Sequence, residues 1–406
     1  MTAALLAHFL PHPAFGRRAA ALAAAAQGRV SPAPVEKSLA AALYGTELRM
    51  SASRLEQFNA CPFRHFVRYG LGALVRPEAK EGAAEYGSFF HAALEAFLRR
   101  CLDEKLNFKT LSEDRIALLL DEILPTVLAA HNDGLFLHNE RLRAGLFLVV
   151  DTLRQSAAAL VRQLAAGSFV PMGTELRFGE GGAFPAIALD LGGGRRAVLS
   201  GVIDRVDRAD TPEGTLLRVI DYKTGGRRLD YGAMLEGLTL QLPLYLAAAT
   251  ALSGTPAGMY YMPVRVAPPA EDEDVAEALQ KQFRLAGVTL SDPRVMECTE
   301  GDLSGTSGVL AGVRRRQDGS LSGALCGGAD MLRLLDRAKE IAARTGRAML
   351  AGEIGVSPAE GACQYCDYRS VCRFDTKLPS CRVRRRRRVP QEDFFAMLGG
   401  ETHAVD

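Results

Sequence analysis

The chain has 406 residues, 48% of them hydrophobic, enough for two or three domains, or for one large domain with insertions, around a sizeable core. Its formal net charge of +2 does not by itself indicate a nucleic-acid partner. The sequence has no run of about eighteen apolar residues and no basic segment before Pro11 and Pro13, so neither a membrane span nor a signal peptide is expected. These observations predict a cytoplasmic protein whose eight cysteines stay reduced or bind metal.

Residues 1–49 are predicted to form a helical, alanine-rich lead-in that carries no chemical signal. Within it, Ala19–Ala26 has the composition of a short helix. A new helix is predicted to follow, with Ser51 or Ser53 as its N-cap and Glu56 close to a capping-box position. The N-terminal part of the chain is therefore expected to be helical.

The next helix is amphipathic and carries the first candidate site residue. It covers Gly82–Leu102, and His91 and Glu95 lie one turn apart on one of its faces. A helical insertion over residues 105–166 follows, interrupted near Asn132-Asp-Gly134. A single histidine on a helix is usually an ordinary core or surface residue, so His91 becomes a candidate ligand only if other ligands lie nearby.

The pattern then changes from helices to strands. A helix is predicted over Leu235–Leu252 and a strand over Gly258–Val266. Residues 267–330 alternate loops and weak elements, and Ala329–Thr345 form a further helix. This order predicts an α/β core over residues 167–266 with a mixed sheet. The strands before the helix are predicted at Phe169–Phe178, Ala183–Leu191, Ala197–Arg208 and Thr215–Thr224, with a hairpin turn at Gly192–Gly194.

Two of these strands carry the most informative residues of the chain. Residues two apart in a strand share a face, so Asp221 and Lys223 project to the same side. Turn-forming residues join the two strands into a hairpin. A symmetric hairpin places Asp204 opposite Val219, beside Asp221 on the same face, whereas a slip of one residue would turn Asp204 away.

This pattern is suited to metal-assisted cleavage of phosphodiesters. Two neighbouring carboxylates offer hard oxygen ligands to Mg²⁺ or Mn²⁺, and a lysine beside them can orient water or stabilise the charge of the transition state. The alternative is an ordinary set of solvated charges on an exposed hairpin. Asp204 follows Val202-Ile203 and Asp221 follows Val219-Ile220, and charges within strands that look buried require partners.

Three cysteines are clustered near the C-terminus, at Cys363, Cys366 and Cys372. Cys61, which precedes a proline, is a candidate fourth ligand, because four thiolates complete either a zinc site or a four-iron cluster. A zinc site with Cys381 as the fourth ligand is an alternative, as is a Cys61 that only fills the core. The other cysteines, Cys101, Cys298 and Cys326, show no ligand spacing and are predicted to be buried.

Positive charge is concentrated in one segment. Residues 363–388 carry nine Lys and Arg against two Asp, a local balance of +7. Such a block is typical of a surface that meets phosphate backbones, and equally of a disordered, solvated tail. No G-x-x-x-x-G-K-[ST] motif is present, so the chain is not expected to hydrolyse ATP.

Six motifs in order resemble the RecB-type branch of the PD-(D/E)XK nucleases, most of all the C-terminal nuclease part of AddB, a subunit of bacterial AddAB helicase–nucleases. The resemblance covers about residues 50–390 and implies a restriction-endonuclease-like core with a mixed central sheet, a helical N-terminal region and insertions. The motifs are Ser51–Glu56 leading to Cys61-Pro62-Phe63, Tyr86–Glu95 with His91, Gly201–Arg205, Asp221-Tyr-Lys223, Gln241–Tyr245, and the C-x2-C-x5-C ending.

The resemblance implies a role for each matching residue. His91, Asp204 and Asp221 would hold Mg²⁺ or Mn²⁺ together with the backbone carbonyl of Tyr222, and Lys223 would be the catalytic lysine. Gln241 would face the site from the following helix, with Tyr245 one turn further on. Glu175 falls where such nucleases often carry an acid, either as an auxiliary ligand or as a salt-bridge partner.

The resemblance also implies cofactors and partners. Cys61, Cys363, Cys366 and Cys372 would bind a 4Fe–4S cluster that joins the N-terminal helix to the C-terminal segment 329–381, ahead of a basic tail at 382–406. The implied function is exonuclease-like DNA cleavage in recombination and double-strand break repair, with an AddA-like subunit as partner. AddB subunits begin with a helicase-like region that this sequence lacks, so it is interpreted as a standalone nuclease, a fragment or a truncated product.

Two other functions remain open at this point. One is an iron–sulfur nuclease of CRISPR adaptation, although the insertion 105–166 and the segment 267–345 make this chain long for that group. The other is a non-catalytic, cluster-bearing DNA-binding module. That function would be favoured if Asp204, Asp221 or Lys223 were missing, and all three are present.

Overall fold

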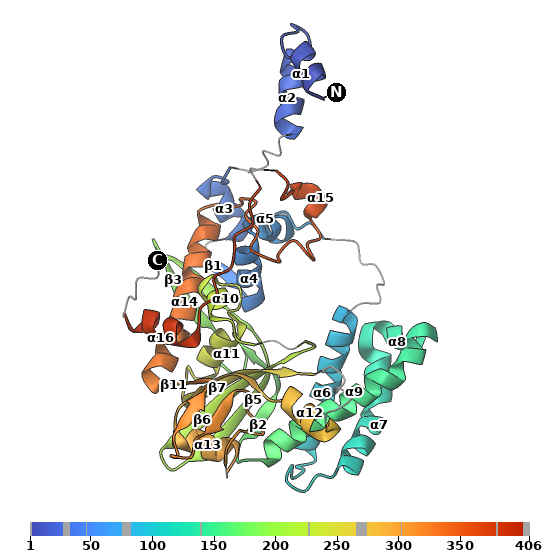
Figure 1. Ribbon diagram of the computed structural model, residues 1–406, viewed down its shortest axis with the longest axis vertical. Helices are drawn as coiled ribbons and strands as arrows, with labels where there is room; N and C mark the ends of the chain where they lie inside the picture. The colour runs from blue at the N-terminus through green and yellow to red at the C-terminus, as the bar shows by residue number, and fades with distance from the viewer. Residues whose placement is uncertain are drawn as a thin grey trace.

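A six-stranded mixed sheet lies at the centre of the computed structural model, in the order β11-β8-β7-β6-β5-β2 (Figure 1). The pairs β6–β7 and β11–β8 are parallel and the others are antiparallel, which confirms the predicted mixed sheet. The strands are β2 (Val170–Phe178), β5 (Gly201–Thr211), β6 (Gly214–Lys223), β7 (Thr255–Pro263), β8 (Ala286–Leu290) and β11 (Leu325–Cys326). The structure describes residues 2–26, 33–45, 47–74, 83–138, 140–225, 228–264, 274–301, 303–378 and 381–400.

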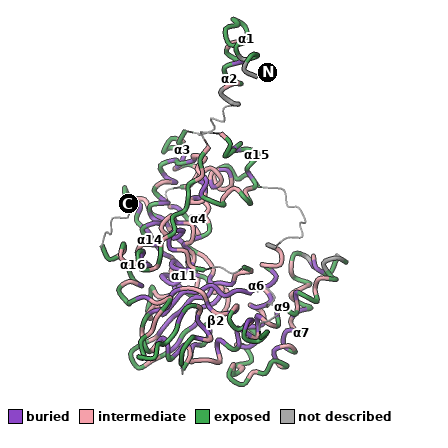
Figure 2. The backbone as a smooth tube through the Cα atoms, in the orientation of Figure 1, coloured by how far each residue is buried: buried purple, intermediate pink, exposed green. Residues whose placement is uncertain are grey.

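Two hydrophobic cores cover the two faces of this sheet. Val219 and Met259 belong to the core shared with α10 (Tyr231–Leu235), α11 (Gln241–Ala249) and α14 (Gly328–Leu350). Ile220 and Tyr260, their neighbours along β6 and β7, belong to the core shared with α6 (Ala83–Asp103), α7 (Glu113–Ala130) and α9 (Glu140–Ala165). Because alternate side chains enter opposite cores, β6 and β7 read as almost continuous apolar runs. Figure 2 shows this burial along the sheet and the inner helices.

A smaller sheet in the order β1-β4-β3 corrects two predictions. The strand predicted over Ala197–Arg208 is broken at Ser200, whose N–H donates to Met50 O at 3.0 Å, so β4 and β5 enter different sheets. Pairing of β1 with β4 also places a strand at the end of the lead-in, where only helix was expected. The predicted glycine turn is confirmed, since residues 192–194 all have positive φ. The strands are β1 (Glu47–Met50), β4 (Arg195–Leu199) and β3 (Ile187–Gly192).

The predicted helical insertion is confirmed, with its interruption at η2 (His131–Gly134) before α8 (Leu135–His138). Within α9, Arg143–Ala165 is long and apolar enough to cross a membrane by length and composition alone, which corrects the expectation that no segment qualifies. Leu153 and Leu160 of this helix are fully buried in the core shared with α6 and α7. Their burial accounts for part of the apolar composition of α9, whereas Phe147 and Leu148 of the same helix are exposed.

Ser51 is the N-cap of α4 (Ala52–Ala60), since its hydroxyl accepts from Arg54 N at 3.2 Å. The helix predicted over Leu235–Leu252 is shorter than expected: α11 covers Gln241–Ala249, and the preceding helix α10 ends at Leu235. The predicted short alanine-rich helix is confirmed as part of α2. The remaining N-terminal helices are α1 (Thr2–Phe9), α2 (Gly16–Ala26), α3 (Lys37–Tyr44), α5 (Pro62–His65) and η1 (Phe66–Gly70).

The basic segment near the C-terminus is not a solvated tail over its described part. Arg384 N donates to Pro358 O at 2.9 Å, and Arg386 pairs with Asp230 at 3.3 Å. The helix α16 (Gln391–Gly399) then packs on α14 through the fully buried Phe394. Residues 401–406 lie outside the described residues. The other elements are α12 (Val275–Gln282), α13 (Pro293–Thr299), β9 (Val313–Arg315), β10 (Leu321–Gly323) and α15 (Arg369–Cys372).

Candidate active site

The hairpin of β5 and β6 brings the two predicted acids together, in a register that differs from the expected one. Val206 pairs with Val219 and Thr211 with Gly214, so the ladder runs toward Asp204 opposite Asp221, not opposite Val219. The difference is two residues because the turn is tighter than predicted. Since side chains alternate with a period of two, a shift of two residues keeps both acids on one face.

Asp204 lies at the end of this ladder and is mostly buried. Its Oδ2 accepts a hydrogen bond from Tyr222 N at 2.7 Å. Burial, and then the neighbouring charge of Asp221, raise the pKa of Asp204 to about 7. A nearby cation would stabilise the ionised carboxylate, which burial and the charge of Asp221 disfavour.

His91 reaches the same point from α6. Its Nε2 lies 2.8 Å from Tyr222 O, and its Nδ1 lies 3.4 Å from Asp204 Oδ2. Burial lowers the pKa of His91, against the opposite effect of Asp221. The imidazole is thereby favoured in its neutral form, the form that binds metals.

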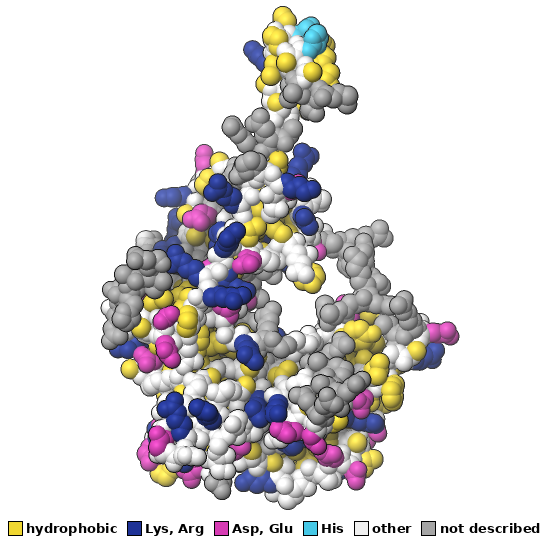
Figure 3. All heavy atoms as spheres, in the orientation of Figure 1, with side chains coloured by type: hydrophobic (Ala, Val, Ile, Leu, Met, Phe, Trp, Pro, Cys, Tyr) yellow, Lys and Arg dark blue, Asp and Glu magenta, His cyan; other side chains and the backbone are white. Residues whose placement is uncertain are grey.

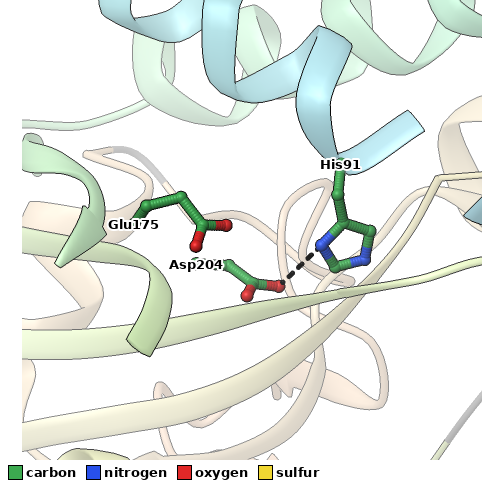
Figure 4. Close-up of side chains that lie close together, drawn as sticks. All are labelled: His91, Glu175 and Asp204. Atoms are coloured by element: carbon green, nitrogen blue, oxygen red, sulfur yellow. Dashed lines mark ion pairs between the residues drawn. The ribbon is translucent and has the colours of Figure 1, made fainter. Parts of the chain in front are cut away.

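Glu175 completes a group of potential ligands with His91 and Asp204 (Figure 4). One ligand atom from each of the three lies within 4.8 Å of those from the other two. Glu175 has a left-handed backbone, with φ of 50°, in a strand that also has a register shift between Pro171 and Gly173. Burial, and then Asp204, raise the pKa of Glu175. Among the described residues Glu175 forms no salt bridge, so its position favours the auxiliary-ligand alternative.

Lys223 lies beside Asp221 as the period of the strand predicts. Its ammonium group forms an ion pair with Asp221 Oδ2, a buried atom that accepts no hydrogen bond in the described part of the chain. Lys223 Nζ also donates to Gln241 Oε1 at 3.4 Å, and Gln241 Nε2 lies 3.5 Å from the hydroxyl of Tyr245. The structure therefore brings Lys223 and Gln241 together on the face of the sheet that α11 covers.

Glu56 fixes the start of α11, a role that the sequence did not indicate. Its Oε1 accepts from Leu240 N at 2.6 Å and from Gln241 N at 3.0 Å. A carboxylate at a helix N-terminus satisfies unpaired N–H groups and is favoured by the helix dipole. Because Ser51 is the N-cap of α4, Glu56 does not stand in the predicted capping box, and it positions Gln241 instead.

The four predicted cluster ligands also approach one another. Burial raises the pKa of Cys363, and the next largest effects on it come from Cys61, Cys366 and Cys372. Backbone hydrogen bonds join the same two segments, since Ala359 N donates to Ala60 O at 2.8 Å and Phe63 N to Gly355 O at 3.2 Å. Cys101, Cys298 and Cys326 are buried as predicted.

Comparison with known proteins places this geometry in a family. Residues 49–373 match the PD-(D/E)XK nuclease superfamily. The chain belongs to this superfamily. Among curated relatives, it is 35% identical over 390 residues to an ATP-dependent helicase/deoxyribonuclease subunit of Moorella thermoacetica, covering 91% of this chain and 34% of the relative. Proteins with the same name match from Symbiobacterium thermophilum (35% identity, 91% of this chain, 33% of the relative) and Desulforudis audaxviator (33%, 90% and 33%).

The chain thus spans about a third of the length of these relatives. It is similar to them over most of its own length, and the family match over residues 49–373 spans the six motifs noted in the sequence. One buried feature of this superfamily member was not singled out from its sequence. Asp207 bridges Arg205 and Arg218 on the opposite face of β5 and β6 from the acids of the site.

Proposed function

We propose that this chain is a metal-dependent DNA nuclease that hydrolyses phosphodiester bonds in an exonuclease-like manner, in double-strand break repair and homologous recombination. The observation that carries the proposal is the convergence of Asp204, Asp221 and Lys223 in a member of the PD-(D/E)XK superfamily. The name of its relatives, a helicase/deoxyribonuclease subunit, supports DNA as the substrate, an AddA-like helicase–nuclease subunit as the partner, and the cytoplasm as the location.

The donor atoms of the site fit a divalent cation. Carboxylate oxygens with one imidazole suit Mg²⁺ or Mn²⁺, and one ligand atom each from His91, Glu175 and Asp204 lies within 4.8 Å of the other two. His91 Nε2 and Tyr222 O are 2.8 Å apart, so both groups lie at one side of the site. His91, Asp204, Asp221 and the Tyr222 carbonyl would hold the cation, with Glu175 as auxiliary ligand.

A cation at this position supplies charge neutralisation of the phosphodiester and a water of lowered pKa. The remaining work falls to the side chains. Lys223, at 21% side-chain exposure, presents a positive charge where negative charge develops on the phosphoryl oxygens. Gln241 accepts from Lys223 and restricts its orientation, while Glu56 holds Gln241 at the helix start.

The four cysteines are proposed to bind a 4Fe–4S cluster. The charges of Cys61, Cys366 and Cys372 are the ones that act most on Cys363, which supports a centre shared by these four thiols. Such a cluster would reinforce the backbone hydrogen bonds between residues 60–63 and 355–359.

A cleavage assay on end-labelled single- and double-stranded DNA tests the proposed function. Anaerobically and aerobically purified protein are compared, with and without Mg²⁺ and without ATP. Release of labelled products only with the metal is expected. Anaerobically purified protein that binds DNA but leaves it uncut with both Mg²⁺ and Mn²⁺ would contradict the proposal.

The affinity of the site for Mn²⁺ is expected to fall about tenfold for each pH unit below about 7. The reason is that Asp204 has a pKa of about 7 and binds the cation only as a carboxylate. Between the ordinary pKa of Asp and about pH 7, and without a cation, Asp204 is protonated in the folded chain and ionised in the unfolded chain. Stability therefore falls as pH rises through that window.

The expected measurement is a larger rise in Tm on adding Mn²⁺ at about pH 8 than at about pH 6. Asp204→Asn serves as the control, because its side chain does not titrate, and it should show a small rise that is the same at both pH values. Equal rises at both pH values in the unmodified protein would show that Asp204 does not take part in binding the cation.

The cluster is expected to disappear in Cys366→Ser, seen as loss of iron and of visible charge-transfer absorption from anaerobically purified protein. Cys381→Ser is the matched control and should keep both, because the thiols that act most on Cys363 are those of Cys61, Cys366 and Cys372. A colourless wild-type protein that contains only zinc would refute the cluster. Loss of absorption in Cys381→Ser would show that Cys381 is a ligand of the cluster.

A further inference from the structure

A cavity of about 550 Å³ is lined by two residues, Tyr261 and Glu56, that also contact residues of the candidate active site. Tyr261 lines the cavity, and its ring centre is 5.9 Å from Lys223 Nζ. Glu56 lines it as well and accepts hydrogen bonds from the backbone of Gln241 and its neighbour. The cavity is therefore close to the lysine that we place at the reacting phosphate.

Three segments that are distant in the sequence enclose this cavity. They are α4 and α5, the region from residue 228 to 239, and the C-terminal segments that contain residues 359–362 and Arg386. Figure 3 shows Lys and Arg side chains over the part of this face where Figure 1 places α4, α10 and the segment leading to α16. The same view shows the molecule hollowed between the part with α4 and α5 and the part with α6, α7 and α9.

Several residues that line the cavity carry buried polar atoms without partners in the described part of the chain. Gln57 Oε1, Arg64 Nε and Thr239 Oγ1 are buried atoms without a hydrogen bond, and all three residues line this one cavity. Buried donors and acceptors are normally satisfied by protein, water or a ligand. The wall of the cavity is therefore polar, and its hydrogen bonds are incomplete among the described residues.

The acidic residues that line the cavity have partners within the protein, whereas two of its arginines have no acidic partner among the described residues. Its acids are used within the protein: Glu56 caps α11, Asp230 pairs with Arg386 and caps α10, and Glu360 accepts from Arg386 N at 3.3 Å. Arg64 and Arg228 have no acidic partner among the described residues, and Arg228 is exposed. Two guanidinium groups are therefore left to bind an anion, and guanidinium suits phosphate in particular.

We propose that this cavity binds backbone phosphates of the DNA strand next to the phosphodiester that is cut, with Arg64 and Arg228 as the phosphate ligands. This inference rests on the proposed nuclease function. The volume is that of a pocket for one small ligand, between about 300 and 1,000 Å³, so it admits a nucleotide or two of a single strand and not a duplex. The contacts to phosphate position the strand and do not read its sequence.

The test is the binding of a fluorescein-labelled oligothymidylate of about twenty nucleotides, followed by anisotropy in EDTA between about 50 and 200 mM salt. Arg64→Ala and Arg228→Ala are each expected to weaken binding by about tenfold, the loss of one charge-assisted contact. Each should also reduce the slope of log affinity against log salt by about 0.7, the value for one phosphate of a single strand. Arg64→Lys, which keeps the charge, should have most of the wild-type affinity and most of the wild-type salt slope.

Arg162→Ala is the matched control, because Arg162 lines a separate cavity of about 710 Å³ between α7, α9 and α12. It removes one positive charge from the protein and should leave affinity and slope unchanged. Thermal melting of every variant shows whether it is folded, and the exposed Arg228 carries the test if Arg64→Ala does not fold.

Unchanged binding in folded Arg228→Ala and Arg64→Ala would overturn the phosphate site while leaving DNA cleavage by the wild-type protein in place. Equal weakening on a blunt duplex would overturn it too, by assigning the arginines to a duplex-binding surface. A wild-type protein that binds the oligonucleotide through these arginines but never cuts DNA with metal would uphold the phosphate site and refute the nuclease function.

Discussion

Replacing Lys223 with alanine is expected to lower the rate of metal-dependent DNA cleavage by about 10²–10³-fold and to leave DNA binding within a few-fold. The ammonium group lies beside Asp221 and 3.4 Å from Gln241 Oε1, at 21% side-chain exposure. A positive charge held in a partly buried site stabilises the transition state far more than a solvated one does. The rate under single-turnover conditions measures the loss directly.

Lys281→Ala is the control for this experiment. It also removes one lysine from an ion pair, with Glu277 at 2.9 Å, but lies exposed on α12, and its cleavage rate should match the wild type. Folding of both variants is compared by thermal melting. Lys223→Ala protein that is folded and cleaves within about tenfold of the wild-type rate would contradict the catalytic role of this residue.

The acid pair could be predicted because its geometry depends on local rules. The period of two in a strand fixes which side chains share a face, and the turn between β5 and β6 brings the strands together. The register could not be predicted to the residue, because the turn is two residues tighter than a symmetric estimate, with Gly214 at φ of 129° and Thr211 Oγ1 donating to its carbonyl at 2.8 Å. An error of two residues left the prediction of a shared face intact.

Contacts between distant segments were out of reach of the sequence. Glu56 and Gln241 are 185 residues apart, and no local pattern distinguishes a glutamate that caps another helix from one in a capping box. The pairing of Glu47 in β1 with Arg196 in β4 is a similar case, since β1 has four residues and follows a helical segment. The sequence motif predicts Gln241 as a site residue, but only the structure shows that Glu56 positions it.

The basic segment shows the same limit. Its charge predicts either a phosphate-binding surface or a solvated tail, and composition cannot separate the two. In the structure, Arg384 Nε donates to Ser357 O at 3.1 Å, and Arg386 pairs with Asp230 at 3.3 Å. Pairing of this kind depends on the approach of chain segments far apart in sequence, so a charge count overstates the number of arginines free to bind DNA.

Asp207 belongs to the same acidic stretch as Asp204, yet it is the most deeply buried acid of the β5–β6 pair. It accepts from Arg205 Nε at 2.6 Å and from Arg218 Nε at 2.8 Å, and all three side chains are at most 1% exposed. Arg218 also stacks over Phe169 at 4.1 Å from the ring centre. Burial would raise the pKa of Asp207, but the two guanidinium groups hold that pKa below its ordinary value.

Asp207→Ala is therefore expected to reduce the free energy of unfolding by about 3–5 kcal/mol, because it leaves two buried guanidinium groups without an anion. The depressed pKa gives the sign of the pH dependence. The contribution of Asp207 is present above its unfolded pKa and is lost as pH falls through its folded value. Urea unfolding at neutral and at acidic pH measures both effects.

Asp210→Ala is a closely matched control on the same strand. Asp210 also pairs with an arginine two residues before it, since Arg208 Nε donates to it at 2.9 Å, but both side chains are exposed, at 47% and 60%. A surface pair of this kind contributes little to stability, so the control should unfold close to the wild type. Equal losses in the two variants would show that burial of the Arg205–Asp207–Arg218 network does not increase its contribution to stability.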